Sequence, residues 1–430
     1  MKHGVKDGSW FFIVIGLSLL AAACAGSGPP QGAATSQTID EPTPLTSPAS
    51  PTSRPPTATV AAENSPLSCS DPFGDTSINF RSDYWDNTDF CKHSVPLSEF
   101  ESGGPPPDGI QPIDNPMFVD HAAGDEWLGD EWPVIAFEID GEARAYPLAI
   151  LLLHEIVNDE VAGQPVAVTY CPLCNAAIVF DRQVNGQVLD FGTTGNLRNS
   201  DLVMYDRQTE SWWQQLTGEA VVGEMTGTQL EFLASRTIAW QDFKARYPEG
   251  TVLSRDSGID RYRDLYGTNP YPGLDSLATN PFGGIGDERL SPMERVVAVE
   301  LENQPVAYPF NTLEQQEVIN DEINSTPLVV FWQAGVRSAV DSQRIEDSRD
   351  VGSTAVYKRT HDDQILTFTA SGEPGQFLDQ QTNSRWNFFG EAIEGPLSGA
   401  QLEQVTSAEH FWFAWAAFKG DTEIRDEASP

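Results

Sequence analysis

Basic residues are scarce in this chain: 25 Lys and Arg stand against 63 Asp and Glu among 430 residues, which gives a formal net charge of −38. Nucleic acids and anionic membrane surfaces are bound by clustered Lys and Arg side chains. The charge balance therefore disfavours nucleic acid as a partner. It indicates an acid-rich, water-exposed surface, and an acidic face for one specific partner is the less favoured interpretation.

Histidine and cysteine are also rare, with six and five residues, and the Gly-x-Ser-x-Gly motif of many hydrolases is absent. A Ser-His-Asp triad is therefore not favoured. Cys69 and Cys91 predict a structural disulfide in an oxidising compartment. Cys171 and Cys174 then remain as the only CxxC pair of the chain.

The N-terminus has the pattern of a targeting segment. Lys2, His3 and Lys6 precede an apolar run from Trp10 to Leu20, and Ala21-Ala22-Ala23-Cys24 follows. This pattern resembles a bacterial lipoprotein signal, with Cys24 as the lipidated residue. It predicts an extracytoplasmic protein that is lipid-anchored to the bacterial cell membrane. An ordinary secretory signal or an uncleaved anchor is the alternative, and it leaves the compartment unchanged.

The rest of the chain divides by composition. Residues 25–66 are rich in Pro, Ser and Thr with few large apolar side chains, which predicts a disordered tether after the signal of residues 1–24. Residues 67–109 form a cysteine-bracketed segment that ends in a Gly/Pro-rich break. We expect the first globular domain, which carries the CxxC pair, over residues 110–285 and a second over residues 286–430.

These two regions resemble one another in sequence. Val134 to Pro147 is echoed by Val296 to Pro309, a shift of 162 residues, and Gln208 to Trp213 is echoed by Gln381 to Trp386. A repeat of this length predicts two tandem homologous domains, an internal duplication whose second copy is degenerate.

Most segments of each copy have the pattern of β-strands. Val134 to Ile139 and Ala143 to Tyr146 flank an Asp-Gly turn, which predicts a hairpin, and short helices are expected after Pro147 and from Trp240 to Tyr247. Asn158 and Asp159 are expected at a helix terminus and turn. The predicted class is α+β with antiparallel sheet predominating, and sandwich and barrel both stay open.

The CxxC pair lies between two apolar runs, Pro165 to Tyr170 and Ala176 to Phe180, which predict strands. Cys171 and Cys174 would then lie at a hairpin tip, where many metal sites present paired sulfurs. In the second copy, Val329 to Trp332 corresponds to Val168 to Cys171, and the loop that follows has no cysteine.

His154 is also confined to the first copy, because Gln316 takes its place in the second. Cys171, Cys174 and His154 therefore form a candidate metal site. Two thiolates and one imidazole favour copper, or zinc with a fourth ligand from Met204, Asp159, Glu155 or water. The alternatives are a local disulfide with a helix-capping His154, and metal-free thiol redox chemistry.

A second cluster in the first copy has polar side chains suited to a pocket for a small polar substrate. Exposed strand ends with Arg-Asp surface pairs are the alternative. The candidates are Ser200, Asp201, Tyr205, Asp206, Arg207 and Gln214.

Four segments, His154 to Asp159, Thr169 to Arg182, Asn199 to Arg207 and Thr209 to Ser211, together resemble a widespread prokaryotic family, domain of unknown function 3179. The resemblance covers roughly residues 130–272. Asn175 departs from it, because a small residue such as Gly is expected there, and Arg198 interrupts the segment before Asn199. The resemblance supports the choice of site and implies no activity.

The leading hypothesis is therefore an extracytoplasmic lipoprotein whose first domain binds a transition metal, with copper favoured, in a metal-handling or redox role. It would work with a redox or metal-transfer partner that the sequence does not identify. One alternative is an enzyme that acts on a small polar substrate beside the CxxC pair. Another is a non-catalytic binding module with a structural disulfide at that position.

Overall fold

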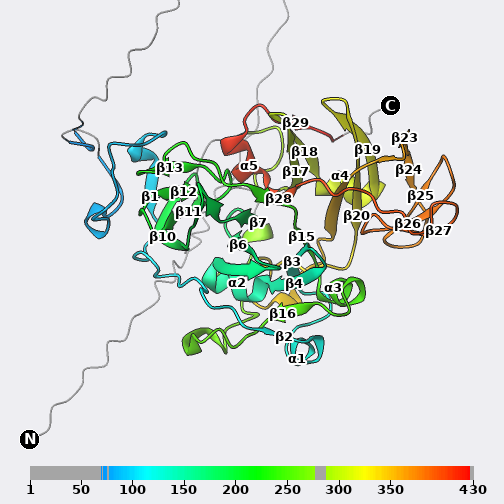
Figure 1. Cartoon of the computed structure of the whole chain (residues 1–430), viewed down its shortest axis with the longest axis horizontal. Helices are drawn as coiled ribbons and strands as arrows, with labels where there is room; N and C mark the ends of the chain where they lie inside the picture. Colours follow the sequence, from blue (N-terminus) through cyan, green and yellow to red (C-terminus); the bar gives the residue numbers. More distant parts are fainter. Residues whose placement is uncertain (1–68, 70, 75–76, 277–286, 427–430) are drawn as a thin grey trace, which may run out of the picture. The chain divides into compact units, whose positions relative to one another are not determined.

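Antiparallel β-strands are the predominant secondary structure of the folded chain, with a few short helices, so the predicted α+β class is confirmed (Figure 1). The structure is a computed structural model that describes residue 69 and residues 71–74, 77–276 and 287–426. Cys24, the predicted signal and the predicted tether lie outside these residues. No helix within the described ranges is long and apolar enough to span a membrane.

The first half of the fold contains three sheets, with strand orders β15-β3-β4-β16-β2, β14-β7-β6-β5 and β1-β10-β11-β12-β13, and a small two-stranded sheet, β8-β9. Its strands are β1 (Phe100–Ser102), β2 (Phe118–Val119), β3 (Pro133–Ile139), β4 (Glu142–Pro147), β5 (Ile156–Val161), β6 (Gln164–Cys171), β7 (Ala176–Asp181), β8 (Gln183–Val184), β9 (Gln187–Val188), β10 (Phe191–Arg198), β11 (Asp201–Asp206), β12 (Trp212–Gln214), β13 (Ala220–Val222), β14 (Phe232–Leu233), β15 (Arg236–Ala239) and β16 (Thr251–Leu253). Its helices are α1 (His121–Asp125), α2 (Leu148–His154) and α3 (Trp240–Arg246).

The second half has sheets of order β28-β17-β18-β29, β19-β20-β21, β22-β23 and β24-β25-β26-β27. Its strands are β17 (Arg295–Leu301), β18 (Gln304–Pro309), β19 (Val318–Ile323), β20 (Thr326–Gln333), β21 (Ser353–Lys358), β22 (Thr360–His361), β23 (Gln364–Ile365), β24 (Phe368–Ala370), β25 (Gln376–Asp379), β26 (Arg385–Asn387), β27 (Ala392–Glu394), β28 (Ala408–Phe411) and β29 (Glu423–Ile424). Its helices are α4 (Phe310–Gln316) and α5 (Trp412–Phe418). Single 3-10 turns lie at Ser82–Tyr84, Leu97–Glu99, Asp260–Tyr262, Leu274–Ser276 and Ile345–Asp347.

The same order of elements occurs in both halves. The sheet order β15-β3-β4-β16 matches β28-β17-β18-β29, and in each case the last pair is parallel. A buried hydrogen-bond network matches as well. Trp213 Nε1 donates to Asp206 at 2.9 Å, and Trp386 Nε1 donates to Asp379 at 2.9 Å.

The strand register corrects the sequence alignment around the CxxC pair by one residue. Ile156 pairs with Thr169 in the first half, and Val318 pairs with Phe331 in the second. Because helices α2 and α4 precede these strands with the same spacing, Cys171 corresponds to Gln333 rather than to Trp332.

Asn158 and Asp159 lie within strand β5, so their predicted place at a helix terminus was wrong. Helix α2 already ends at His154, because Glu155 adopts a positive φ of 59° that turns the chain into β5. Asn158 exchanges hydrogen bonds of 2.8 and 2.9 Å with the backbone of Phe191. Asp159 accepts a hydrogen bond of 2.6 Å from Tyr146 and pairs with Arg144.

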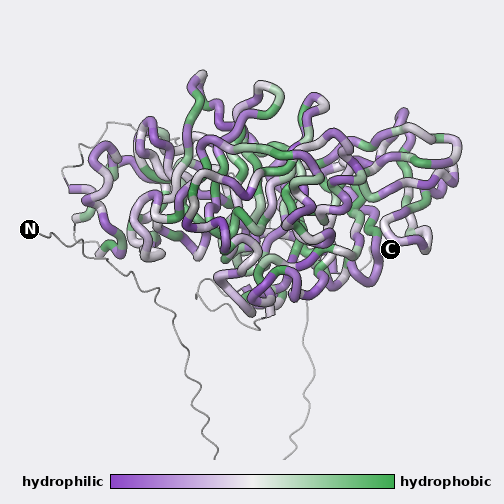
Figure 2. The backbone as a smooth tube through the Cα atoms, turned by 90° about the horizontal axis from the view of Figure 1, so that it is seen from below, coloured by the Kyte–Doolittle hydropathy of each residue, from purple (hydrophilic) through white to green (hydrophobic). Residues whose placement is uncertain are grey.

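The described part of residues 67–430 belongs to one compact unit, and buried side chains of both halves join in one hydrophobic cluster that includes Trp213, Trp240, Trp386 and Trp412. Figure 2 shows hydrophobic stretches gathered in the middle of the fold with hydrophilic loops around them. The predicted disulfide is present, because Cys69 and Cys91 are bonded with their Cα atoms 5.7 Å apart.

Candidate metal centre

The CxxC pair lies at the tip of the hairpin formed by strands β6 and β7, as predicted. Cys171 pairs with Ala176 as the last rung of the ladder, so residues 172–175 form the turn. Asn175 has a left-handed φ of 51°, a conformation that Asn tolerates better than most residues other than Gly. This explains why Asn can stand where the family resemblance suggests a small residue.

A second hairpin, formed by β10 and β11, meets this tip. Arg198 pairs with Asp201, and the two residues between them, Asn199 and Ser200, have positive φ values of 52° and 64°. Two consecutive positive φ values are typical of the type I′ turn, whose twist suits a tight antiparallel hairpin. The Ser200 carbonyl accepts hydrogen bonds from the thiols of Cys174 at 3.5 Å and Cys171 at 3.9 Å.

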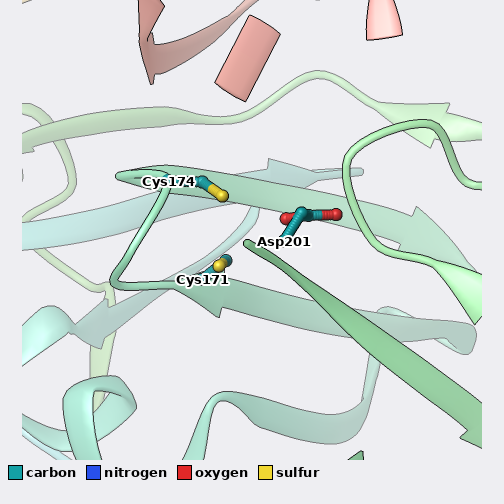
Figure 3. Close-up of side chains that lie close together, drawn as sticks. All are labelled: Cys171, Cys174 and Asp201. Atoms are coloured by element: carbon teal, nitrogen blue, oxygen red, sulfur yellow. The ribbon is translucent and has the colours of Figure 1, made fainter. Parts of the chain in front are cut away.

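The two hairpins bring three metal-binding side chains together. The sulfurs of Cys171 and Cys174 and a carboxylate oxygen of Asp201 all lie within 4.8 Å of one another, and all three residues are buried. Figure 3 shows Asp201 at the start of β11 beside the two sulfurs. Among the residues that the structure describes, this is the one group of three or more Cys, His, Asp or Glu ligand atoms with this spacing.

One oxygen of Asp201 has hydrogen-bond partners and the other does not. Oδ2 accepts from Gln214 Nε2 at 2.6 Å and from the backbone N–H of Leu216 at 2.9 Å. Oδ1 is buried, and no donor lies in hydrogen-bonding geometry to it, although both thiols lie close enough to the carboxyl group to favour its charged form. The geometry of both thiols directs them at the Ser200 carbonyl. A buried carboxylate oxygen without a partner is unfavourable, and a bound cation would stabilise it.

The centre gathers acidic groups in a dry environment. Burial raises the pKa of Asp201 to about 6 and also raises the pKa of the Cys171 and Cys174 thiols. Glu155 is buried close by, and burial together with the charge of Asp201 raises its pKa to about 8. A divalent cation among these groups would favour their deprotonated forms.

His154 lies outside this group, although it directly precedes Glu155. Its Nδ1 contacts the Gln111 carbonyl at 2.6 Å, and its Nε2 contacts the Tyr266 hydroxyl at 2.7 Å. A carbonyl only accepts, so Nδ1 carries the proton and Nε2 accepts from Tyr266. Burial lowers the pKa of His154 to about 4, which keeps the ring neutral. The structure therefore gathers Cys171, Cys174 and Asp201, with His154 held by other partners.

Three of the pocket candidates lie at this centre: Asp201 itself, Ser200 through its carbonyl, and Gln214 through its amide. Asp201 was thus among the candidate residues but not among the candidate ligands. Like the cysteines, Asp201 has no equivalent in the second half of the sequence, and this is the sequence signal that could have identified it as a ligand. Met204 lies three residues further along β11 in the main hydrophobic core.

The other pocket candidates belong to separate networks. Tyr205 donates to Asp108 at 2.9 Å, and Arg207 pairs with Asp108 at 3.2 Å and with Asp114 at 2.8 Å. Asp206 accepts from Trp213 in the buried network that Asp379 repeats in the second half. A network present in both halves indicates a structural role for Asp206.

Comparison with known proteins gives one match. A family model described as "Protein of unknown function (DUF3179)" matches residues 107–422, which includes both halves of the fold and not only the segments around the CxxC pair. No curated protein and no solved structure matches the chain.

Proposed function

The chain belongs to the DUF3179 family, whose description gives no activity, so we propose a function from the site itself: Cys171, Cys174 and Asp201 hold a transition metal ion. The observation that carries this proposal is the buried, unpartnered Asp201 Oδ1 beside two buried thiols. Three such groups are costly to keep together without a cation, whereas a metal ion uses all three.

The donor set bears on the identity of the metal. Two thiolates and one carboxylate suit Zn²⁺, which commonly completes a tetrahedral site with a fourth ligand. Copper was favoured on the basis of His154, and a hard carboxylate in its place shifts the preference towards zinc. Glu155 or a water molecule is the proposed fourth ligand, since Glu155 lies close enough to Asp201 for their charges to interact.

Metal content is the decisive measurement. The full chain, purified under reducing conditions without a metal-affinity tag, should carry about one equivalent of zinc by elemental analysis. Cys171→Ser and Asp201→Asn should each lose it, and His154→Gln is the matched control that should retain it. A wild-type chain that contains no stoichiometric metal and takes up none when reduced would overturn the proposal. If His154→Gln lost the metal and Asp201→Asn kept it, the ligands would be Cys171, Cys174 and His154 instead.

Thiol redox chemistry is the second candidate, because the sulfurs of Cys171 and Cys174 lie within 4.8 Å of one another. Burial opposes it, since a raised pKa leaves little of the reactive thiolate at neutral pH. Counting free thiols before and after mild reduction separates the candidates: a dithiol that cycles freely would favour redox use, and protection of the thiols by zinc would favour the metal centre.

An enzyme that acts on a small polar substrate is a weaker proposal. Arg207 and Tyr205, two side chains expected to bind such a substrate, have Asp108 as their partner in the structure. A thermal-shift screen of small anions and sugars with Arg207→Ala tests this alternative. A ligand-dependent stabilisation that the variant loses would favour the enzyme, and no such difference would count against it. The non-catalytic module with a disulfide at the CxxC pair predicts no free thiols before reduction.

We also propose that the protein is a lipid-anchored, extracytoplasmic member of its family and exchanges metal or electrons with a partner there. The signal-like N-terminus supports this location, and so does the Cys69–Cys91 disulfide, which is typical of an oxidising compartment. Palmitate labelling that is retained in a Cys24→Ala variant would argue against the anchor.

The internal duplication is likewise an inference. What supports it is the same strand order in the two halves and the matched networks around Asp206 and Asp379. On this proposal the boundary between the domains lies near residue 286, and the second domain has lost the ligands of the metal centre.

A further inference from the structure

A cavity of about 410 Å³ lies in the second half, where the start of helix α4, the end of strand β20 and the segment that leads into β17 come together. Most of its lining is polar, and two aromatic side chains, Phe310 and Trp332, also line it. Cavities of this size are typical of sites for small ligands and far exceed the voids of close-packed cores. Asn311, Glu314 and Arg349 line the cavity and are exposed, so a ligand from solution can reach it.

The charges of the lining do not cancel. Both arginines of the lining pair with the buried Asp275, Arg295 at 2.9 Å and Arg349 at 2.9 Å. The acids outnumber these arginines by four to two, so the lining carries two excess negative charges when all six groups are ionised. The four acids are Asp275, Glu294, Glu314 and Asp350. The cavity therefore favours a cation over an anion.

Glu294 and Glu314 are the acids available to a ligand. Neither forms an ion pair with a side chain that the structure describes, and Glu294 accepts one hydrogen bond of 3.3 Å from the backbone N–H of Asn311. Asp350 differs, because both of its carboxylate oxygens accept from backbone N–H groups of the surrounding loop. Burial raises the pKa of Glu294, and a cation beside it would favour its ionised form.

The corresponding helix of the first half has an apolar, closed face. Helices α2 and α4 begin directly after a proline and have the same length, so Asn311 and Glu314 stand where α2 has Ala149 and Leu152. Ala149 and Leu152 are 1% and 3% exposed. A carboxylate at this position is therefore not required by the order of elements that the two halves share.

We propose that this cavity binds a small organic cation, with its charged nitrogen between Glu294 and Glu314 and its apolar body against Phe310 and Trp332. Carboxylates and the faces of aromatic rings are the groups that hold ammonium ions in proteins. None of the proposed metal ligands lines the cavity, and neither do the two groups that donate to Asp201 Oδ2. The proposal goes beyond the metal centre and can be tested with the metal removed.

Benzylamine and benzyl alcohol are a matched pair of probes, because they have nearly the same shape and only benzylamine is positively charged at neutral pH. Binding to the full chain is measured for both by ligand-observed NMR titration, with chelator present and at physiological salt, which screens attraction to the rest of the acidic surface. The wild type should prefer benzylamine by about tenfold. Glu314→Gln should weaken benzylamine binding by about fivefold and leave the binding of benzyl alcohol unchanged.

A control variant separates a local site from the net charge of the chain. Glu322→Gln removes the same charge from an exposed glutamate that does not line the cavity, and it should leave benzylamine binding unchanged. Glu294→Gln should weaken benzylamine binding at least as much as Glu314→Gln, since Glu294 is the less exposed of the two.

Three results would overturn the proposal. They are failure of the wild type to prefer benzylamine, unchanged binding in Glu314→Gln, and an equal loss in Glu314→Gln and Glu322→Gln. The last would mean that the net charge of the chain attracts the probe. Because chelator is present throughout, none of these results bears on the metal centre.

Discussion

The β6–β7 hairpin of the first half and the β20–β21 hairpin of the second have the same strand register but different tips. Cys171 pairs with Ala176 in one and Gln333 pairs with Ser353 in the other. In the first half residues 172–175 close the turn and carry a thiol, whereas in the second half residues 334–352 form a long segment. The same pair of strands can therefore carry either a short turn or a long segment at its tip. The residues of the tip decide whether metal ligands are present.

The long segment of the second half serves packing. Its backbone holds the chain that joins the two halves, for example through the Gln343 carbonyl, which accepts from Asn269 N–H at 2.8 Å. It also supplies Arg349, which pairs with the buried Asp275 at 2.9 Å, and Arg295 of β17 pairs with the same carboxylate at 2.9 Å.

Asp201 and Asp275 are both buried acids, and they differ in how their charge is balanced. Burial would raise the pKa of Asp275, but the charge and hydrogen bonds of Arg295 together with the charge of Arg349 outweigh it, and the pKa is lowered. The groups that stabilise the charge of Asp201 are all uncharged, namely Gln214, the backbone of Leu216 and the two neighbouring thiols, and burial raises its pKa to about 6. A buried acid without a cationic side chain indicates a functional site, and one with two arginines indicates a structural pair.

Of the substitutions that test this comparison, removal of Arg295 should have the largest effect on the stability of the protein. Arg295→Met leaves Asp275 buried with one half-exposed arginine, and we expect a loss of about 3 kcal/mol in the free energy of unfolding, measured by urea denaturation. Arg344→Met, which breaks the exposed pair with Glu346, is the control and should change the free energy by less than about 0.5 kcal/mol. Equal effects of the two variants would show that Asp275 does not depend on Arg295.

In the metal-free protein, Asp201→Asn should increase the free energy of unfolding, whereas Arg295→Met decreases it. An acid whose pKa is higher in the folded chain than in the unfolded chain loses stability as the pH rises between the two values. For Asp201 this interval runs from 3.8 to about 6, so the asparagine variant should gain on the order of 2 kcal/mol above pH 6 and no stability below pH 4. Urea denaturation across this pH range, with chelator present, measures the gain.

With zinc bound, the wild type should be more stable than Asp201→Asn, because only the wild type retains the carboxylate ligand. A metal-free Asp201→Asn protein that is less stable than the wild type at pH 7 would mean that the carboxylate has a stabilising partner in the folded chain. The comparison with Asp275 would then fail.

The local features of the site could be predicted from the sequence. The apolar, strand-forming runs on both sides of Cys171 and Cys174 predicted the hairpin correctly, and the Asp140-Gly141 turn of the β3–β4 hairpin was also correct. Both depend on residues close in sequence, where strand pattern and turn chemistry act directly.

The pairing of Asp201 with the thiols could not be predicted in this way. It depends on the tip of one hairpin meeting the tip of another, and on a turn of two residues that sets the register of β11. His154 was chosen because, like the two cysteines, it is missing from the second half. Its actual partners, Gln111 and Tyr266, come from distant segments for which no sequence pattern predicts contact.

The smallest effect should come from Gln214, which orients Asp201 without touching the metal. Gln214→Met removes the 2.6 Å hydrogen bond to Oδ2 and leaves Leu216 as the only donor to that oxygen. Groups that orient a ligand change metal affinity by roughly tenfold, about 1.4 kcal/mol, and we expect the zinc affinity to fall by this amount in a chelator competition.

Asn387, the counterpart of Gln214 in β26, distinguishes an effect on the ligand from an effect on the fold. Its side chain accepts from the backbone of Phe389 and Glu391, so Asn387→Leu should reduce stability and leave zinc affinity unchanged. If both variants weakened zinc binding equally, the affinity would follow the stability of the whole fold. If only Gln214→Met does so, the difference between the halves lies in how the first half holds one carboxylate against two sulfurs.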